Sequence, residues 1–192
     1  MADTAQPVAL RALLEAAREG AADAQCRLAD RYFAGDGVEQ DFVQAAYWTL
    51  RAAEQGSAHA QFNLGLSYAR GEGVAQDATE AAKCIRKSAE QGYANAQAML
   101  AQAYWDGSGF EQDFVEAAKR YRLAAERGLA HAMTNLGLAY SNGQGVPPDS
   151  VEAIKWYSRA ANMGEAAAQQ NLADAYSRGR HVEQDPAKAA AW

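Results

Sequence analysis

The side chains best suited to chemistry in this sequence are three histidines. His59 and His131 occupy equivalent positions 72 residues apart, two periods of a 36-residue repeat. At about 10 Å per stacked helical layer they lie roughly 20 Å from each other, too far to bind one zinc ion. His181 replaces a loop glycine, and histidine sometimes tolerates the left-handed backbone of such a position. The sequence therefore predicts no metal site, no histidine base and no cofactor.

A series of aspartates, one per repeat, offers the next candidates for catalysis: Asp41, Asp77, Asp113, Asp149 and Asp185. Carboxylates that work as an acid–base pair lie roughly 5 to 10 Å apart, a limit that residues one repeat apart only approach. Each aspartate precedes an alanine-rich segment, where its carboxylate is expected to accept a hydrogen bond from an orphaned amide at a helix start. Glu80, three residues after Asp77, is expected to reach back and complete a capping box. Capping thus explains these acids, and no catalytic residue is predicted.

Paired glycines such as Gly71-Glu72-Gly73 resemble phosphate-binding loops only superficially. They follow predicted helices rather than strands, and no P-loop lysine accompanies them. Glycine adopts the positive φ values that a sharp connection between two helices requires. These segments are therefore predicted to be turns.

The elements that carry these residues repeat along the whole chain. NLGLSYARGEGVAQD, residues 63–77, returns as NLGLAYSNGQGVPPD, residues 135–149. Three further series keep the same period: Gly20, Gly56, Gly92, Gly128 and Gly164; Leu28, Leu64, Leu100, Leu136 and Leu172; Tyr32, Tyr68, Tyr104, Tyr140 and Tyr176. A fixed period of this length indicates a solenoid, in which each unit buries its apolar face against its neighbours.

One period, residues 57–92, predicts two helices. Ala60, Leu64 and Tyr68 recur at helical spacing and place a packing face on a first helix over 57–69. A second helix is predicted to begin at Asp77 and to end at Gly92 in a C-terminal cap. Its alanine pairs allow neighbouring helices to approach closely. The tyrosine series is expected to pack with the leucines.

The pattern Ala-x-x-x-Leu-Gly-x-x-Tyr-x-x-Gly-x-Gly-Val-x-x-Asp, followed by Glu-Ala-x-Lys-Trp-Tyr and Ala-Ala-x-x-Gly, resembles the Sel1-like repeat family, and residues 135–164 match it almost throughout. The resemblance extends from about residue 7 to residue 192. It implies an all-α fold, a right-handed α/α superhelical solenoid related to tetratricopeptide arrays, with the first helices lining the concave side.

The register divides the chain into an N-terminal capping helix within residues 1–20 and an array over 21–192. The array comprises repeats 21–56, 57–92, 93–128 and 129–164 and a partial repeat 165–192. Trp192 aligns with Trp48 and Trp156, in the middle of a second helix. Because solenoids normally close with a polar cap, we expect either a longer protein or self-association through this open end.

Composition excludes several classes of function. Lys and Arg number 18 against 24 Asp and Glu, with no basic run, so a nucleic-acid partner is not expected. No apolar stretch of about eighteen residues predicts membrane insertion, and residues 1–7 lack the features of a signal peptide. Cys26 and Cys84 lie in different registers, which predicts free buried thiols rather than the disulfides of some exported Sel1-like proteins. The protein is predicted to be cytoplasmic, or periplasmic if an export signal has been removed.

The positions that vary between repeats are the candidates for binding a partner. On the first helices, a stripe faces away from the leucine and tyrosine positions. Similarity to tetratricopeptide arrays implies that this stripe lines the concave groove. Trp105 is added as an anchor because its register otherwise holds mostly small residues. The predicted partner-binding residues are His59, Asn63, Leu66, Arg70, Asn95, Met99, Gln102, Trp105, Asp106, His131, Asn135, Leu138, Asn142, Asn171 and Arg178.

The predicted function is that of a non-enzymatic adaptor that binds a peptide or domain of a partner protein in its groove. Two readings of the recurring asparagines stay open: they bond a bound backbone, or they tie the first helix to a neighbouring loop. The enzymatic alternative is β-lactam binding or hydrolysis, as linked to some cysteine-rich relatives, but no Ser-x-x-Lys motif supplies a nucleophile. A structural repeat fragment without a specific partner is the third possibility.

Overall fold

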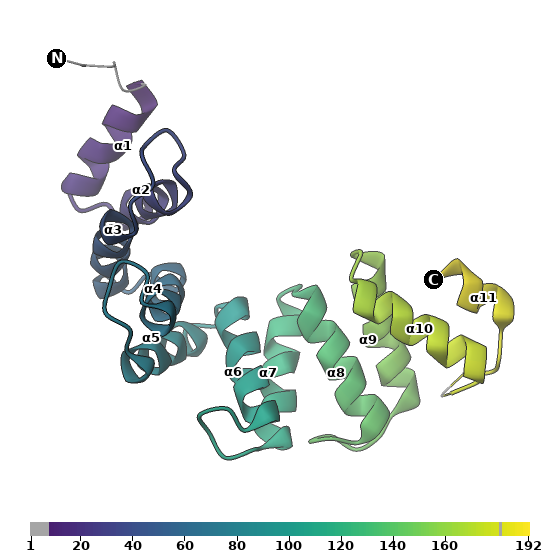
Figure 1. Cartoon of the computed structure of the whole chain (residues 1–192). Helices are drawn as coiled ribbons and strands as arrows, with labels where there is room; N and C mark the ends of the chain where they lie inside the picture. The colour runs from purple at the N-terminus through teal and green to yellow at the C-terminus, as the bar shows by residue number, and fades with distance from the viewer. Residues whose placement is uncertain (1–7, 181) are drawn as a thin grey trace. The chain divides into compact units, whose positions relative to one another are not determined.

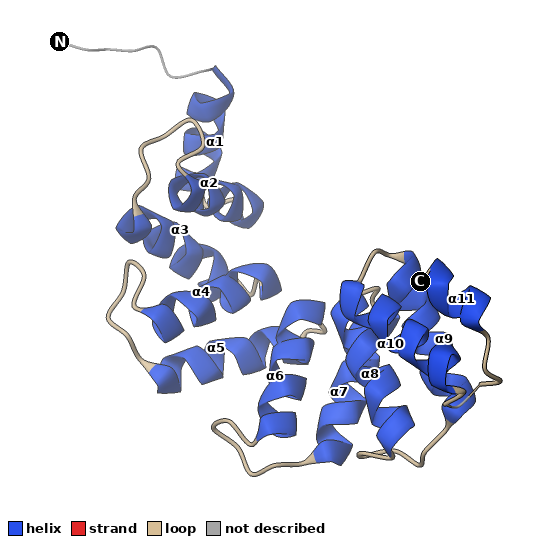
Figure 2. Ribbon diagram, turned by 45° about the vertical axis from the view of Figure 1, so that its right-hand side comes forward, coloured by secondary structure: helices blue, strands red, loops and turns tan. Residues whose placement is uncertain are grey.

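The computed structural model describes residues 8–180 and 182–192, and helices are the only regular elements among them (Figure 2). His181 lies outside the described residues. In chain order the helices are α1 (Val8–Arg18), α2 (Ala22–Ala34), α3 (Phe42–Glu54), α4 (Ala58–Arg70), α5 (Ala78–Glu90), α6 (Ala94–Asp106), α7 (Phe114–Glu126), α8 (Ala130–Asn142), α9 (Ser150–Asn162), α10 (Ala166–Arg178) and α11 (Pro186–Ala191).

The chain forms two units, residues 1–93 and 94–192. In the first unit α2 packs on α3 and α4 on α5; in the second α6 packs on α7 and α8 on α9 (Figure 1). Each pair is one repeat, made of a first and a second helix. The predicted all-α repeat fold is confirmed.

The cores of both units are built from the periodic residues. In the first unit Leu10, Leu13, Leu28 and Trp48 form one buried cluster, and alanines of α3 and α4 pack with Leu64 in another. In the second unit a larger cluster holds the fully buried side chains of Tyr121, Leu136 and Leu172. The tyrosine series packs on these clusters, as predicted: Tyr32, Tyr68, Tyr104, Tyr140 and Tyr176.

The connection between the two helices of a repeat is held by backbone and side-chain hydrogen bonds. Gly71 ends α4 in the left-handed conformation, with φ of 72°, and its N–H donates to the Ser67 carbonyl. The side-chain amide of Gln76 then donates to the carbonyl of Ala69 at 2.9 Å. These bonds satisfy carbonyls at the helix end that have no partner within the helix. The prediction that the paired glycines form turns is correct here.

The aspartate caps form as predicted, but the capping box does not. Asp77 accepts hydrogen bonds from the N–H groups of Thr79 and Glu80, at 2.9 and 3.0 Å. The prediction that Glu80 bonds back to the Asp77 N–H is wrong, because that N–H already donates to the Tyr68 carbonyl at 2.9 Å. Glu80 instead pairs with Lys83 at 2.7 Å. The same amide-to-tyrosine bond recurs in every repeat, at Asp41, Asp113, Asp149 and Asp185.

The two terminal helices among the described residues are shorter than the helices between them. Helix α1 contacts α2, and its Leu10 and Leu13 are buried, whereas α11 has no buried residue. That residues 1–20 act as a cap, and that the other end self-associates, stay predictions. Among the described residues, no helix combines the length and apolar character needed to cross a membrane.

Candidate partner-binding site

The fifteen predicted residues all lie on first helices, and none of them is buried. Those that are half-buried are His59, Asn63, Leu66, Trp105, Asn135, Leu138 and Asn171. Those that are exposed are Arg70, Asn95, Met99, Gln102, Asp106, His131, Asn142 and Arg178. The stripe is therefore accessible to a partner, although its binding role stays a prediction.

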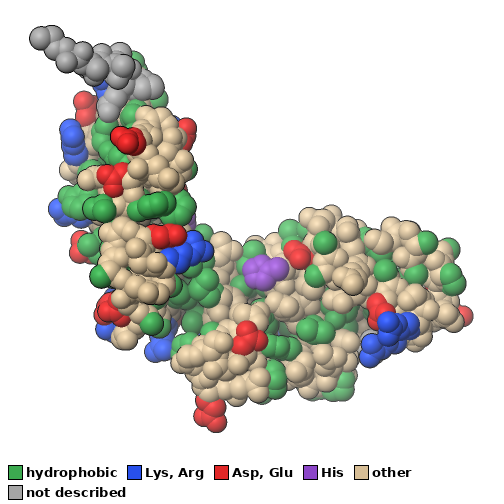
Figure 3. Space-filling model, in the orientation of Figure 1, with side chains coloured by type: hydrophobic (Ala, Val, Ile, Leu, Met, Phe, Trp, Pro, Cys, Tyr) green, Lys and Arg blue, Asp and Glu red, His purple; other side chains and the backbone are tan. Residues whose placement is uncertain are grey.

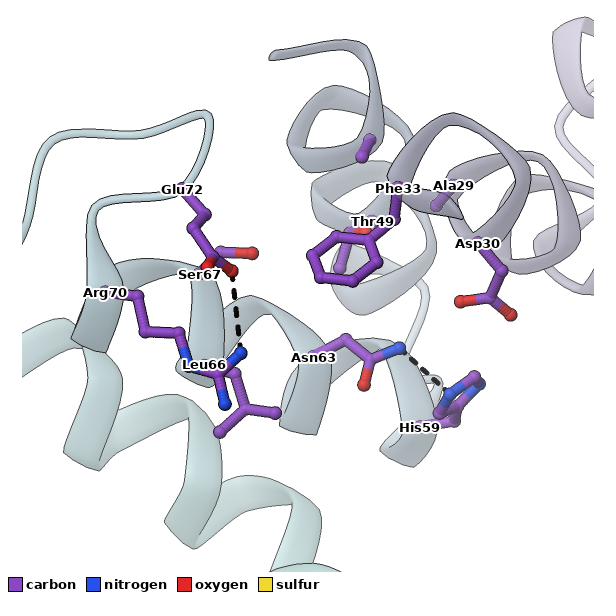
Figure 4. A pocket seen from close by; sticks show the side chains of 11 residues that line it. Ala29, Asp30, Phe33, Thr49, His59, Asn63, Leu66, Ser67, Arg70 and Glu72 are labelled. Carbon is purple, nitrogen blue, oxygen red and sulfur yellow. Dashed lines mark hydrogen bonds and ion pairs between the residues drawn. The ribbon is translucent and has the colours of Figure 1, made fainter. Parts of the chain in front are cut away.

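Four of these residues meet in a cleft of the first unit, at His59, Asn63, Leu66 and Arg70. The cleft has a volume of about 350 Å³ and lies among α2, α3 and α4 (Figure 4). Its other lining residues are Ala29, Asp30, Phe33, Ala45, Thr49, Ser67 and Glu72. Four of the lining residues are apolar and seven are polar or charged, so the cleft offers both kinds of contact to a partner.

Two polar contacts run along the wall formed by α4 and its following loop. The side-chain amide of Asn63 lies 2.9 Å from Nε2 of His59, and Arg70 pairs with Glu72 at 3.7 Å (Figure 4). Asn63 therefore bonds a side chain of its own helix rather than a neighbouring loop. In the second unit Asn135 bonds the hydroxyl of Tyr121, a buried side chain of α7. The two asparagines have different surroundings despite their shared register.

Thr49 is the lining residue that sequence reasoning missed. It comes from the second helix α3 and is 6% exposed. Among the described residues its hydroxyl has no hydrogen-bond partner, whereas buried Thr134 donates to the Ala130 carbonyl. The sequence does contain a signal for this lining residue. The equivalent positions of the later repeats hold Ile85, Tyr121 and Tyr157, and threonine is the smallest of the four side chains.

The second unit contains the corresponding site among α8, α9 and α10, where the cavity measures about 100 Å³. The predicted residues Leu138, Asn142 and Asn171 line it together with Tyr157. The hydroxyl of Tyr157 bonds Ser141, and burial raises the pKa of Tyr157 to about 12. Gly137 leaves room for this ring, since a Cβ there would lie 2.7 Å from it. The ring of Tyr157 therefore forms this wall of the site.

Trp105 belongs to the packing of its own repeat. Its ring meets those of Phe114 and Tyr121 edge to face, with centroids 5.1 and 6.0 Å apart. Such pairs stabilise a fold beyond simple burial. The ring is half-buried, so its role as a binding anchor stays a prediction while its packing role is observed.

The remaining polar members of the stripe are engaged mainly with each other or with neighbours on the same helix. Gln102 donates to Asp106 at 2.7 Å, and Arg178 pairs with Asp174 at 2.6 Å. These are exposed contacts of a kind that contributes only about 0.2–1 kcal/mol, so they break readily when a partner competes for them.

The described residues contain no group of three His, Cys, Asp or Glu side chains placed to hold a metal ion. Cys26 and Cys84 are free and half-buried rather than fully buried, and burial raises the pKa of both thiols. A raised pKa keeps a thiol protonated and poorly nucleophilic at neutral pH. On the face drawn in Figure 3, basic side chains form no continuous patch. The described surface thus offers a cleft rather than a recognisable catalytic centre.

Paired helices, a 36-residue period and an accessible stripe define the class of α/α repeat proteins. The chain belongs to the Sel1 repeat family, whose sequence profile matches residues 22–57, 58–93, 94–129, 130–165 and 166–192. These repeat boundaries differ by one residue from those predicted. No curated protein sequence matches the chain significantly.

Solved structures agree with this assignment. A protective antigen of uropathogenic Escherichia coli with an SLR fold is 38% identical, with a TM-score of 0.86 over 95% of this chain and 39% of that one. A Sel1 repeat protein from Oxalobacter formigenes is 39% identical, with a TM-score of 0.83 over 91% of this chain and 69% of that one. Helicobacter pylori cysteine rich protein B shares the fold alone, at 22% identity and a TM-score of 0.52 over 70% of this chain and 96% of that one. The chain spans about two fifths of the Escherichia coli protein.

Proposed function

We propose that this protein is a non-enzymatic adaptor that binds a segment of a partner protein along the exposed stripe of its first helices. Sel1 repeat proteins are in general protein-interaction modules. The observation that carries the proposal for this chain is the cleft among α2, α3 and α4, since it joins four stripe residues to apolar and polar neighbours. In this reading the stripe is the concave groove implied by the resemblance to tetratricopeptide arrays.

The cleft suits a protein segment better than a reactive substrate. Its apolar part, Phe33 and Leu66, accepts a side chain, while Asn63 and Asp30 offer a donor and an acceptor for polar groups. Nothing in the described residues favours β-lactam hydrolysis. A chromogenic cephalosporin assay is expected to show no turnover.

The proposal is tested by affinity capture from cells of the source organism. The intact protein is compared with a cleft variant, His59→Ala, Asn63→Ala and Leu66→Ala, and with a control variant, Val43→Ser, Val115→Ser and Val151→Ser, at three exposed positions of second helices. Circular dichroism first confirms that all three proteins are folded.

A partner captured at near-equal molar amount by the intact protein and the control, but lost by the cleft variant, is the expected result. Its binding is then measured with purified components by calorimetry. Equal capture by all three proteins would overturn the proposal, because binding would then be independent of the stripe.

A further inference from the structure

Tyr121 shows how this fold holds a phenol ring between two consecutive first helices. The ring is 1% exposed, and its hydroxyl donates to Oε1 of Gln102 on α6 at 2.7 Å and bonds Asn135 on α8. Trp105 meets the ring edge to face. The second helix α7 supplies the tyrosine, and both neighbouring first helices supply its partners.

The first unit has a polar or aromatic residue at each of these partner positions but lacks the ring. Positions 72 residues earlier in the sequence are Asp30 for Gln102, Asn63 for Asn135, Phe33 for Trp105 and Thr49 for Tyr121. The adjacent ring pair is kept as well, since Phe33 meets Phe42 edge to face at 5.4 Å, as Trp105 meets Phe114 at 5.1 Å. The framework of the phenol site is therefore repeated around a threonine.

The space left by the missing ring is the cleft already described. It measures about 350 Å³, against about 100 Å³ at the site where Tyr157 supplies the ring. Thr49 lines it with a side chain that is 94% buried and a hydroxyl that bonds no described residue. In Figure 4, Asp30, Phe33 and Asn63 surround this space from α2 and α4.

We propose that the cleft among α2, α3 and α4 receives a tyrosine side chain of the partner segment, in the place that Tyr121 occupies in the second unit. This inference rests on the proposed function and specifies which side chain of the partner the cleft recognises. The phenol hydroxyl donates to the carboxylate of Asp30 and accepts from the side-chain amide of Asn63. That amide has two N–H donors, so its contact with His59 persists.

These contacts make the cleft selective for the unmodified phenol. An ionised aspartate only accepts hydrogen bonds, so it favours tyrosine over phenylalanine, which leaves Asp30 without a donor when the cleft is filled. Phosphotyrosine is disfavoured because its dianion would face the carboxylates of Asp30 and Glu72. Phe33 supplies the edge-to-face contact for the ring.

The direct test titrates the full chain with N-acetyl-tyrosinamide and follows the Asn63 side-chain amide and the Thr49 methyl group by nuclear magnetic resonance. We expect saturable shifts, binding of N-acetyl-phenylalaninamide weaker by about tenfold, and none with the phosphorylated compound. Thr49→Tyr fills the cleft and is expected to abolish the response. Thr134→Ser in α8 serves as the matched control and retains it. Absence of shifts at Asn63 and Thr49 would overturn the inference.

A randomised peptide library displayed against the intact protein and Thr49→Tyr separates this inference from the proposed function. Enrichment of tyrosine at one position, lost with Thr49→Tyr, supports both. Peptides selected without tyrosine, equally by both proteins and dependent on stripe residues, overturn the tyrosine site and leave the adaptor function standing. If no peptide binds either protein, both proposals fail.

Discussion

The site among α2, α3 and α4 and the site among α8, α9 and α10 are built from equivalent backbone positions, yet one is open and the other nearly filled. One difference lies at a second-helix position, where Thr49 stands in the first unit and the much larger Tyr157 in the second. Asn63 and Asn171 hold the same register at both sites. The size of a residue behind the exposed stripe thus affects how much space the stripe encloses.

Tyr121→Thr is expected to have the largest effect on stability. It removes a buried ring at the register of Thr49 and Tyr157 and leaves Gln102 and Asn135 without their hydrogen-bonding partner. The free energy of unfolding of the second unit should fall by about 4 kcal/mol, the range of large-to-small core changes. Urea denaturation with hydrogen exchange resolved for α6 to α8 measures the loss. The control Leu123→Thr, at an exposed position of the same helix, should cost far less. Equal losses would show that burial of a ring at this register does not stabilise the second unit.

Alkaline pH should lower the stability of the second unit because of the buried tyrosines at this register. Burial raises the pKa of Tyr157 from its ordinary 10 to about 12 and also raises that of Tyr121. The unfolded chain releases these protons above pH 10 while the folded chain keeps them, so this stability is complete below pH 10. For Tyr157 roughly 2 kcal/mol should be lost between pH 10 and pH 12.

The measurement is urea denaturation of the intact protein and of Tyr157→Phe across that pH range. Tyr157→Phe should show a shallower decline, and Tyr47→Phe, at an exposed position of α3, should decline like the intact protein. Parallel curves for all three proteins would contradict the assigned cause.

Thr49→Tyr converts the open site into the filled one. Because the partner positions Asp30 and Asn63 are in place, the added ring should stabilise the first unit by about 1.5 kcal/mol, within the range of cavity-filling changes. Thermal unfolding of the variant and of Thr134→Tyr provides the contrast. Thr134 is buried and bonds the Ala130 carbonyl, so a ring there should overpack the core and destabilise it. A Thr49→Tyr protein less stable than the intact one would show that the cleft is not shaped for a phenol.

The sequence predicted what depends on local backbone chemistry. The first helix over residues 57–69 corresponds to α4, the turn glycine Gly71 has positive φ, and Asp77 caps α5. The capping box failed because the Asp77 amide has a partner, the Tyr68 carbonyl, that lies outside the pattern considered.

The cleft could not be predicted from the residues of the first helices alone. His59, Asn63, Leu66 and Arg70 were identified as stripe residues, but the space between them depends on the size of Thr49, which lies on the next helix. Trp105 illustrates the same limit, since its size suggested an anchor although Phe114 and Tyr121 pack against it. Comparison of the second-helix register across repeats would have identified both the filled and the open sites.

Replacing the capping aspartates is expected to have the smallest effect on stability. It also tests whether the two units differ in the stability of their second helices. Asp41 accepts from Val43 and Gln44, and Asp149 from Val151 and Glu152, with the same 2.9 and 3.0 Å distances. Asp41→Ala and Asp149→Ala should therefore each cost about 1 kcal/mol, and asparagine at either position should recover most of it. Hydrogen exchange at the first turns of α3 and α9 measures the two losses separately. Equal losses would locate the difference between the units at the Thr49 register, whereas a much larger loss at Asp41 would mean that the open site also weakens the helix that carries Thr49.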